Sequence, residues 1–430
     1  MQLSLFTTDD KIVVPRKNGN ANKLDINDKR LHDWYRFVLS FPPHLVRDYL
    51  IRFGLKHGDT VLDPFCGTGT TLVEAKLHGV SSIGIEANTM AYFASSVKVD
   101  WSVDPHEFLN HAISVASRAN KIISTESTSS LRKLPEKAFS LLLSDSISPL
   151  PLHKSLVLLE QIKNNSEQQF LNHELLALAK SLVFSISNLH FGPEVGVLRT
   201  KKTDAPVVES WLSEIKSMCA DLQTARNQDT PAVIHHSDSR DLDQLLQPQS
   251  IDAVFTSPPY PNEKDYTRTT RLESVILGFI NNKDELRALK KGLLRSNTRN
   301  VYKGDNDDEW VSQHEEIQTI ADTIEKRRIE LNKTSGFEKL YGRVTKLYFG
   351  GMARHLAALR PFLKPGAHLG YVVGDQASYF QVMIKTGNIL ADIAKSLGYE
   401  IVGIDLFRTR HATVTKKQMR EEVLVLRWVQ

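Results

Sequence analysis

The sequence predicts an α/β protein with a doubly wound, seven-stranded, mostly parallel sheet, an antiparallel C-terminal hairpin and two helical insertions. Short runs rich in Val and Ile alternate with helical patterns, as buried parallel strands do. Gly or Pro residues punctuate most of the runs. The last two runs are joined by a short basic stretch with no room for a crossover helix, so they should form the hairpin. The runs are Thr60–Asp63, Ser82–Glu86, Ala232–His236, Ile251–Thr256, His368–Gly374, Glu400–Phe407 and Glu422–Trp428.

The spacing of these runs predicts the insertions. About 145 residues separate the second run from the third, and about 110 separate the fourth from the fifth, far more than a crossover needs. Both stretches contain helical patterns, for instance Asn172–Asn188 and Asp308–Leu331. In the second of these, one helical stripe should face a core or a partner helix. The stripe consists of Trp310, Ile317, Ile320, Ile324 and Leu331.

This spacing also predicts the domain organisation. The sheet-bearing domain should comprise residues 29–100, 231–262 and 340–430. The first insertion should span residues 101–230, and a second, basic insertion should span residues 263–339. Residues 1–28 are polar and are expected to be a loosely ordered lead-in.

The composition is that of an ordinary soluble globular protein. Of 430 residues, 41% are hydrophobic and 24% are charged. No apolar run approaches the roughly 18 residues that span a bilayer, and the N-terminus lacks a signal-peptide pattern. The two cysteines, Cys66 and Cys219, cannot form a disulfide framework or a four-cysteine zinc site. We therefore expect a cytoplasmic protein without a membrane or metal site.

Positive charge is concentrated in two segments, although the net charge is only +4. Between Lys264 and Lys303 there are ten Lys or Arg residues against four Asp or Glu residues. A charge run is as often a solvated surface as a binding surface, but both segments adjoin the motifs described below, which favours phosphate contact. The second segment contains Arg408, Arg410, His411, Lys416, Lys417 and Arg420.

A glycine loop follows the first strand, in the sequence Asp63-Pro-Phe-Cys-Gly-Thr-Gly-Thr-Thr71. Its glycines permit a tight turn and close approach of a ligand, but the loop does not match the dinucleotide fingerprint. Asp63 suits a ligand with an ammonium group better than one with a pyrophosphate. Glu86, at the end of the next strand, could take both ribose hydroxyls of an adenosine ligand. Asp238, after the third strand, is placed to accept from an adenine amino group.

A second motif, Thr256-Ser-Pro-Pro-Tyr260, ends the fourth strand. Ligands bind beyond the carboxyl ends of strands in doubly wound sheets. The Ser257 hydroxyl and the Pro258 carbonyl can accept hydrogen bonds from an exocyclic amine, and Tyr260 offers a flat face for a base. Neither Cys66 nor Cys219 stands in a Pro-Cys context, so a thiolate nucleophile is not expected.

Both motifs resemble those of DNA amino-methyltransferases, which bind S-adenosylmethionine on a Rossmann-like class I methyltransferase fold. The resemblance implies that the sheet-bearing domain is catalytic. It also implies that Trp34–Leu45, which contains Phe41-Pro-Pro-His-Leu45, matches the helix-leading motif that precedes the cofactor loop. The implied catalytic residues are Ser257, Pro258, Pro259 and Tyr260. The implied cofactor residues are Asp63, Pro64, Phe65, Gly67, Thr68, Gly69, Thr70, Glu86, Asp238 and Pro43.

The resemblance implies direct transfer of a methyl group to an exocyclic amine, with S-adenosylhomocysteine as the second product and without a metal. Ser-Pro-Pro-Tyr is commonest among the cytosine-N4 enzymes, whereas adenine-N6 enzymes more often carry Asp or Asn where Ser257 stands. The sequence therefore favours N4 of a cytosine flipped out of duplex DNA. The cofactor loop precedes the catalytic motif in this chain, whereas the commonest order among cytosine-N4 enzymes is the reverse. The region that reads the DNA sequence in those enzymes therefore cannot be assigned to this chain by position.

The basic segments predict contacts with double-stranded DNA through Arg268, Arg271, Arg408 and Arg410. No nuclease site is evident, so a restriction endonuclease would be a separate chain; a monomer and a homodimer both fit. Three alternatives stay open. They are an adenine-N6 DNA methyltransferase, an RNA base amino-methyltransferase, and a non-catalytic DNA- or cofactor-binding protein on the same scaffold. No appended RNA-binding module is evident, which disfavours the second, and both motifs are intact, which disfavours the third.

Overall fold

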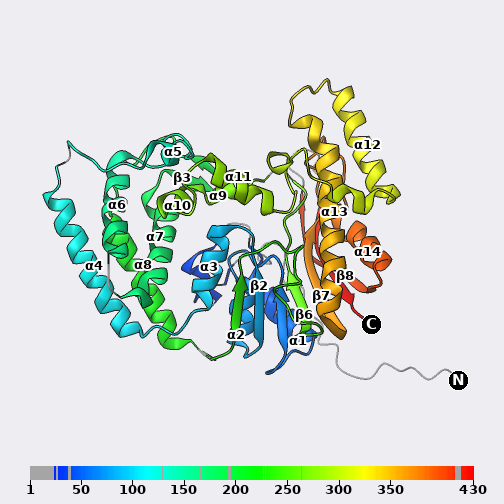
Figure 1. The fold of residues 1–430 in the computed structure, drawn as a ribbon, viewed down its shortest axis with the longest axis horizontal. Helices are drawn as coiled ribbons and strands as arrows, with labels where there is room; N and C mark the ends of the chain where they lie inside the picture. Colours follow the sequence, from blue (N-terminus) through cyan, green and yellow to red (C-terminus); the bar gives the residue numbers. More distant parts are fainter. Residues whose placement is uncertain are drawn as a thin grey trace.

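A seven-stranded sheet forms the centre of the protein in the computed structural model (Figure 1). Its strand order is β5-β2-β1-β6-β7-β9-β8. The first five strands in that order are parallel, and β9 runs antiparallel to both β7 and β8. The predicted fold class and the C-terminal hairpin are therefore confirmed. The strands are β1 (Thr60–Asp63), β2 (Ser81–Ile85), β5 (Ala232–His235), β6 (Ile251–Thr256), β7 (Leu363–Gly374), β8 (Glu400–His411) and β9 (Gln418–Arg427).

The structure describes most of the chain outside the N-terminal segment. The described residues are 24–25, 28–36, 40–127, 129–164, 167–191, 195–225, 227, 229–262, 264–411 and 418–430. The lead-in expected over residues 1–28 falls almost entirely outside them, as do Lys416 and Lys417 of the second basic segment. Within the described residues, no helix is both long and apolar enough to cross a bilayer.

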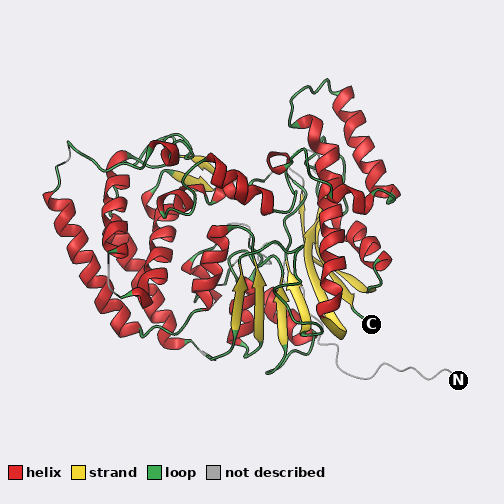
Figure 2. Cartoon of the chain, in the orientation of Figure 1, coloured by secondary structure: helices red, strands yellow, loops and turns green. Residues whose placement is uncertain are grey.

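Helices cover both faces of the sheet, and the alternation of side chains along each strand explains why (Figure 2). In β1, Val61 packs in the cluster beneath α1 (Pro43–Arg52) and α2 (Thr70–Leu77), whereas Leu62 packs on the opposite face. That opposite face is covered by α13 (Tyr341–Leu359) and α14 (Thr386–Ser396). Successive apolar residues therefore serve two cores, which is why the strands read as continuous apolar runs.

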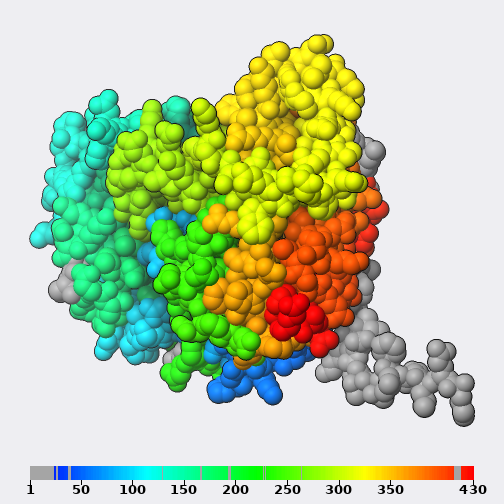
Figure 3. Space-filling model, turned by 45° about the vertical axis from the view of Figure 1, so that its right-hand side comes forward, coloured from blue at the N-terminus to red at the C-terminus, as the bar shows by residue number. Residues whose placement is uncertain are grey.

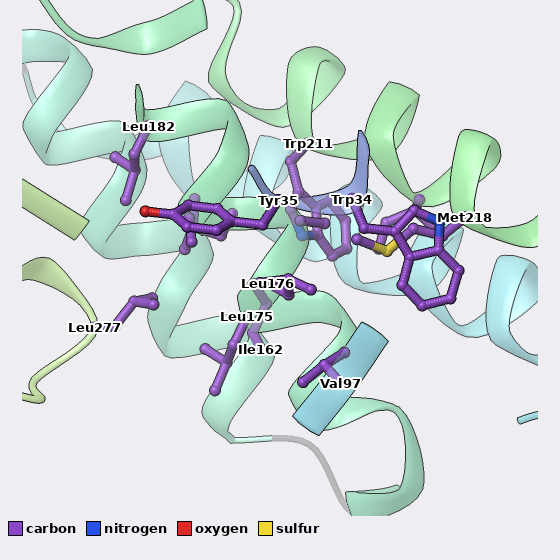
Figure 4. Packing of buried hydrophobic residues seen from close by; sticks show 14 of the residues in the cluster. Trp34, Tyr35, Val97, Ile162, Leu175, Leu176, Leu182, Trp211, Met218 and Leu277 are labelled. Atoms are coloured by element: carbon purple, nitrogen blue, oxygen red, sulfur yellow. The ribbon is translucent and has the colours of Figure 1, made fainter. Parts of the chain in front are cut away.

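The first insertion forms a helical layer beside the sheet. Its buried side chains form one cluster with those of α3 (Thr89–Val99) and of the short segment η2 (His32–Trp34). Figure 4 shows Trp34 and Tyr35 among side chains of this layer. The elements are α4 (Pro105–Thr125), α5 (Glu136–Phe139), α6 (Pro149–Lys163), α7 (Gln168–Ser181), the π-helical η3 (Leu182–Ile186), the hairpin β3 (Leu189–Phe191) and β4 (Val195–Val197), and α8 (Val207–Thr224).

The second insertion packs in two places. Its first helices join the first insertion, because Leu272 and Ile276 lie in that cluster, while Ile317 and Ile324 pack on the sheet side against α13. In Figure 3 the part around α12, coloured yellow, projects above the neighbouring surface of the molecule. The elements are α9 (Tyr266–Thr269), α10 (Arg271–Ile276), α11 (Lys283–Gly292), η4 (Thr298–Asn300), η5 (Asp307–Val311), α12 (Glu315–Glu330) and η6 (Glu338–Leu340).

The expected apolar stripe of this insertion is correct only in its middle. Ile317, Ile320 and Ile324 are buried in α12, but Trp310 is 51% exposed and Leu331 is 45% exposed. Trp310 belongs to the separate 3₁₀ turn η5, and residues 312–314 break the helix before α12 begins. A break resets the helical phase, so a stripe drawn through it misplaces the residue on its far side. Leu331 follows the last residue of α12 as its C-cap.

Candidate active site

The two predicted motifs meet at the carboxyl edge of the sheet. β1 and β6 are parallel neighbours, with Leu62 paired to Val254 in the register. The Thr256 hydroxyl at the end of β6 donates a hydrogen bond of 2.6 Å to Oδ1 of Asp63 at the end of β1. In Figure 2 the arrowheads of the central strands point toward the helical insertions, so the motifs lie beneath them. The glycine loop and the Ser257–Tyr260 segment therefore border the same part of the molecule.

The loop after β1 needs glycine at two positions. Gly67 has φ +52° and Gly69 has φ +82°, in the left-handed region that favours glycine. At Gly69 an added Cβ would lie 3.0 Å from Cβ of Ser95, so the loop packs closely against α3. At Gly67 an added Cβ would meet no heavy atom of the described residues within 4 Å. The loop thus presents open space at Gly67, which is what a ligand-binding loop requires.

Asp63 is a buried carboxylate with an unsatisfied oxygen. The side chain is 1% exposed, and Oδ2 has no hydrogen-bond partner among the described residues. Burial raises the pKa of Asp63 to about 6, even though hydrogen bonds from Thr256, Thr71 and the Phe65 N–H act in the opposite direction. A cationic donor placed at Oδ2 would relieve this cost.

Glu86 stands beside Asp63 as a second partly desolvated acid. Its Oε2 accepts from the Gly67 N–H at 2.8 Å, and its Oε1 accepts from the Asn88 N–H at 2.7 Å. Burial raises the pKa of Glu86 to about 7, and the charge of Asp63 contributes in the same direction. Thr68 Oγ1 is also buried and unpartnered within the described chain. Two carboxyls with raised pKa values and an unused hydroxyl fit a ligand that brings positive charge and hydrogen-bonding groups.

Asp238 follows β5, as the sequence predicted, but its carboxylate is already engaged. Arg240 donates to both of its oxygens, at 2.9 Å and 3.1 Å from Nε and at 2.5 Å from Nη2. Arg240 also pairs with Asp307 from the second insertion. An adenine amino group would therefore share Asp238 with Arg240, and the assignment of Asp238 to the cofactor stays a prediction.

The Ser257–Tyr260 segment continues from β6 and leans on β7. The Ser257 hydroxyl donates to the Val372 carbonyl at 3.2 Å and also forms a hydrogen bond with the Tyr260 hydroxyl, so one lone pair is left for a further donor. The Tyr260 ring lies against the end of β7, since a Cβ added at Gly374 would stand 3.2 Å from Cε2 of Tyr260. Burial, aided by the charge of Glu421, raises the pKa of Tyr260, so the phenol stays neutral. Pro258 is buried, and Pro259 is half-buried.

Of the remaining predicted cofactor residues, Pro64 and Phe65 lie in the loop and Thr70 begins the helix after it, whereas Pro43 lies outside the loop. Pro64 and Thr70 are buried, and α2 begins at Thr70 directly after Gly69. Phe65 contacts the ring of His355 edge-on, with centroids 5.0 Å apart. Pro43 is the buried first residue of α1. It lies on the face of the sheet served by α1 and α2, and its predicted contact with the cofactor stays a prediction.

The four predicted DNA-binding arginines all contact other parts of the protein. Arg271 donates to the Thr267 carbonyl at 3.1 Å and to the Leu141 carbonyl at 3.5 Å, and so joins the two insertions. Arg268 lies one turn earlier, and its charge lowers the pKa of Arg271 after the larger effect of burial. Arg408 pairs with Glu421 at 2.5 Å, and Arg410 lies 3.4 Å from the same carboxylate.

Sequence reasoning missed His355 and Lys98, which support the loop from two sides. His355 is 0% exposed and lies 2.8 Å from the Ser239 carbonyl and 2.9 Å from the Tyr371 hydroxyl. Lys98 is 1% exposed and donates to the Thr68 carbonyl at 2.7 Å. Burial lowers the pKa of His355 to about 4 and that of Lys98 to about 7. No local signal marks either residue, because a lone His or Lys in a helix is usually a surface group.

The two cysteines do not supply a nucleophile here. Burial raises the pKa of Cys66 well above its usual value and that of Cys219 to about 11, so both thiols stay protonated at neutral pH. No cluster of three or more potential metal ligands occurs among the described residues.

The chain is similar in sequence to known DNA methyltransferases. The profile of the family described as DNA methylase matches residues 13–95. The type II methyltransferase M.BsoBI of Geobacillus stearothermophilus is 25% identical, over 95% of this chain and 85% of that protein. The type II methyltransferase M.AvaI of Nostoc sp. is 29% identical, over 35% of this chain and 31% of that protein.

Two further similarities involve RNA-modifying enzymes. A tRNA (guanine(10)-N2)-dimethyltransferase of Methanothermobacter thermautotrophicus is 37% identical over 18% of this chain and 23% of that protein. Among solved structures, an rRNA methyltransferase from Streptomyces viridochromogenes aligns over 92% of this chain and 87% of that chain, at 9% identity and a TM-score of 0.31. The structural alignment is too weak to bear on fold or function.

The strand order, the antiparallel β9 and the two loops at the carboxyl edge define a Rossmann-like class I methyltransferase. The matches to the DNA methylase profile and to M.BsoBI indicate a more particular group. The chain is similar to DNA amino-methyltransferases, and the relative that aligns over most of it is a type II DNA methyltransferase.

Proposed function

We propose that the protein transfers a methyl group from S-adenosylmethionine to the exocyclic N4 of a cytosine flipped out of duplex DNA. The observation that carries the proposal is the Asp63–Thr256 hydrogen bond of 2.6 Å, which holds the cofactor loop beside the residues that would receive the target amine. Type II methyltransferases among the relatives support DNA as the substrate. The Ser at position 257 supports cytosine over adenine.

The cofactor residues would act by charge and shape. S-adenosylmethionine, when bound, supplies a methyl group that its sulfonium already activates. Asp63 would accept the ammonium group at Oδ2, the oxygen without a partner in the described chain. Glu86 would accept the ribose hydroxyls while it continues to hold the Gly67 N–H. The raised pKa values of both acids support this assignment, because a cationic ligand stabilises two carboxylates that burial otherwise destabilises.

The catalytic segment would act by orientation. The Ser257 hydroxyl and the Pro258 carbonyl would accept hydrogen bonds from the two N–H groups of the amine and so direct its lone pair at the methyl group. Tyr260 would stack on the base, with its ring held by the end of β7. The neutral amine would attack the methyl carbon in line, so that the N–C bond forms as the S–C bond breaks and S-adenosylhomocysteine leaves. The positive charge that passes to the nitrogen would then be removed by loss of a proton to solvent. No covalent intermediate with the enzyme is needed.

A second candidate is methylation of an exocyclic amine in RNA. The similarity to a tRNA guanine-N2 enzyme favours it, but that match covers only 18% of this chain. Adenine N6 in DNA is the third candidate, since the family includes both base specificities. All three candidate activities would use the same cofactor loop and the same amine pocket. They would differ in the nucleic acid and the base that the protein accepts.

One experiment separates these candidates. The purified protein is incubated with cofactor carrying a labelled methyl group and with genomic DNA or total RNA, and the labelled nucleoside is then identified. We expect N4-methylcytosine from DNA. N6-methyladenine from DNA would correct the base, label in RNA alone would correct the substrate, and no transfer to either would contradict the proposed activity. Mapping the labelled sites would also give the recognition sequence.

A restriction endonuclease on a separate chain and a cytoplasmic location belong to the same proposal.

The proposed DNA contacts predict a change in salt dependence. Replacing Arg268 or Arg271 with Gln should weaken DNA binding and reduce the slope of log affinity against log salt by about 0.9 for each phosphate that is no longer neutralised. Arg271 also holds two internal carbonyls, so the melting temperature of its variant is measured alongside. The control is Arg328→Gln, which removes a surface arginine paired with Glu325 on α12. A double variant with the parent slope would show that neither arginine contacts phosphate.

A further inference from the structure

One face of helix α13 lies beside the proposed cofactor site. His355 on this face contacts Phe65 of the cofactor loop at 5.0 Å between ring centroids and bonds the Ser239 carbonyl, next to Asp238. One turn earlier, a Cβ added at Gly351 would lie 3.9 Å from Cδ of Arg240, which holds Asp238. Tyr348 stands seven residues before His355, and residues seven apart share a face of a helix. The face that covers the cofactor end therefore continues to Tyr348.

Tyr348 carries a hydroxyl that the described residues do not satisfy. Its side chain is 0% exposed, and its hydroxyl has no hydrogen-bond partner in the described part of the chain. Buried tyrosine hydroxyls normally find a partner, because an unmade buried hydrogen bond is costly. By contrast, Tyr371 and Tyr399, which pack near α13, bond His355 and the Leu356 carbonyl respectively.

The surroundings of Tyr348 point to the catalytic segment. Burial raises the pKa of Tyr348 well above its usual value, and the phenols of Tyr260 and Tyr266 contribute further. The charge of Glu86, after burial, helps to raise the pKa of Tyr266. Geometry links this stretch of α13 to the catalytic segment: a Cβ added at Gly351 would lie 2.5 Å from Cδ1 of Leu294. Two residues after Leu294, the Ser296 carbonyl accepts from the N–H of Asn262, which follows Tyr260 by two residues, at 3.0 Å. The part of α13 that carries Tyr348 therefore packs on the segment that holds the end of the catalytic motif.

The chemistry of the target base requires a donor at this place. Ser257 and Pro258 supply acceptors for the amine, but the ring nitrogen beside the amine, N3 of cytosine or N1 of adenine, is itself an acceptor. A buried acceptor left without a donor costs binding energy and discriminates strongly between bases. A tyrosine hydroxyl can donate to such a nitrogen, and a neutral phenol with a raised pKa keeps its proton.

We propose that the Tyr348 hydroxyl donates a hydrogen bond to the ring nitrogen next to the methylated amine, and so makes Tyr348 a base-recognition residue. The inference rests on the proposed function and extends it to a residue outside both motifs. It also explains why a large buried side chain keeps a polar group in an apolar cluster that includes Tyr379 and Phe349.

Tyr348→Phe removes only the hydroxyl, so it tests the proposal with little risk to the fold. On a duplex that carries the mapped site, we expect kcat/KM for methyl transfer to fall by about 3- to 10-fold, the effect of one neutral hydrogen bond. Affinity for S-adenosylhomocysteine, measured by calorimetry, should be unchanged. The melting temperature should equal or exceed that of the parent, because an unsatisfied buried hydroxyl has been removed.

A modified base tests where the Tyr348 hydroxyl binds. In 3-deazacytosine, or 1-deazaadenine if adenine is the target, a C–H group replaces the ring nitrogen while the amine is kept. Parent and Tyr348→Phe should transfer methyl groups to that base at equal rates, because neither can form the bond. Equal rates of the two proteins on the natural base, or the same fractional loss on both bases, would overturn the inference.

Tyr399→Phe is the matched control. The Tyr399 hydroxyl donates a hydrogen bond of 2.8 Å to the Leu356 carbonyl, away from the catalytic segment. This variant should therefore melt at a lower temperature than the parent but transfer methyl groups at the parent rate. A parent that methylates neither DNA nor RNA would contradict the proposed function and this inference together. A parent that methylates DNA and is matched by Tyr348→Phe would contradict this inference alone.

Discussion

Asp63→Asn should lose cofactor binding while the empty protein becomes more stable above about pH 6. The substitution removes the charge that would pair with the ammonium group, and loss of one partner of a buried charged pair costs about 2–5 kcal/mol, or at least about 30-fold in affinity. Calorimetry with S-adenosylhomocysteine, which carries the same ammonium group, measures the loss. Binding to the parent should also weaken as the pH falls through about 6, since protonated Asp63 carries no charge.

The gain in stability follows from the raised pKa of Asp63. The folded pKa is about 6 against an ordinary 3.8, so the native state binds the proton more tightly than the unfolded state does. Linkage then makes parent stability fall as the pH rises from about 4 to about 6, and the full penalty of ~3 kcal/mol applies above that window. Asparagine has no proton to lose, so the variant lacks this contribution to the pH dependence.

Asp252→Asn provides the matched control on the neighbouring strand. Asp252 accepts from the Thr60 N–H at 2.9 Å and from Lys364 at 2.7 Å, so its charge is satisfied in the folded protein. This variant should bind cofactor normally and be less stable than the parent. Should Asp63→Asn retain cofactor affinity, the ammonium group is held elsewhere and the proposed orientation of the cofactor is wrong.

Tyr260→Ala and Ser257→Ala should abolish methyl transfer while cofactor binding survives. Stacking of a base on an aromatic ring is worth about 1–3 kcal/mol, and misplacement of the amine adds a loss of up to about 100-fold. For Tyr260→Ala we therefore expect a fall in kcat/KM of about 100-fold or more. Ser257→Ala removes an acceptor needed only when the amine is in place, so kcat should fall more than DNA affinity does.

Tyr260→Phe separates stacking from the hydroxyl. It keeps the ring that lies against the end of β7, so it should retain most of the parent activity. Labelled methyl transfer to the mapped duplex, together with calorimetry for the cofactor, gives both readouts for the three variants. If Ser257→Ala and Tyr260→Ala both turn over at the parent rate, this segment does not bind the amine, whatever their affinity for the cofactor.

Local patterns in the sequence determined the sheet and both motif loops. A strand buried on both faces needs a continuous apolar run, and a tight loop at its end needs glycines, so β1, β6, Gly67 and Gly69 could be predicted from neighbours in the chain. The C-terminal hairpin also followed, because a short connection leaves no room for a crossover helix. The predicted stripe was wrong at its two ends. A break between η5 and α12 changes the helical phase at Trp310, and Leu331 lies after the last residue of α12.

Only the tertiary structure decided which distant groups meet at the site. Thr256 donates a hydrogen bond to Asp63, 193 positions away in the chain. Arg240 binds the carboxylate of Asp238, which we assigned to the adenine from the sequence. His355, Lys98 and Tyr348 carry no local signal, since burial and unmet hydrogen bonds are properties of packing. The physical reason is range: backbone preference acts over a few residues, whereas desolvation and charge depend on every segment folded around a group.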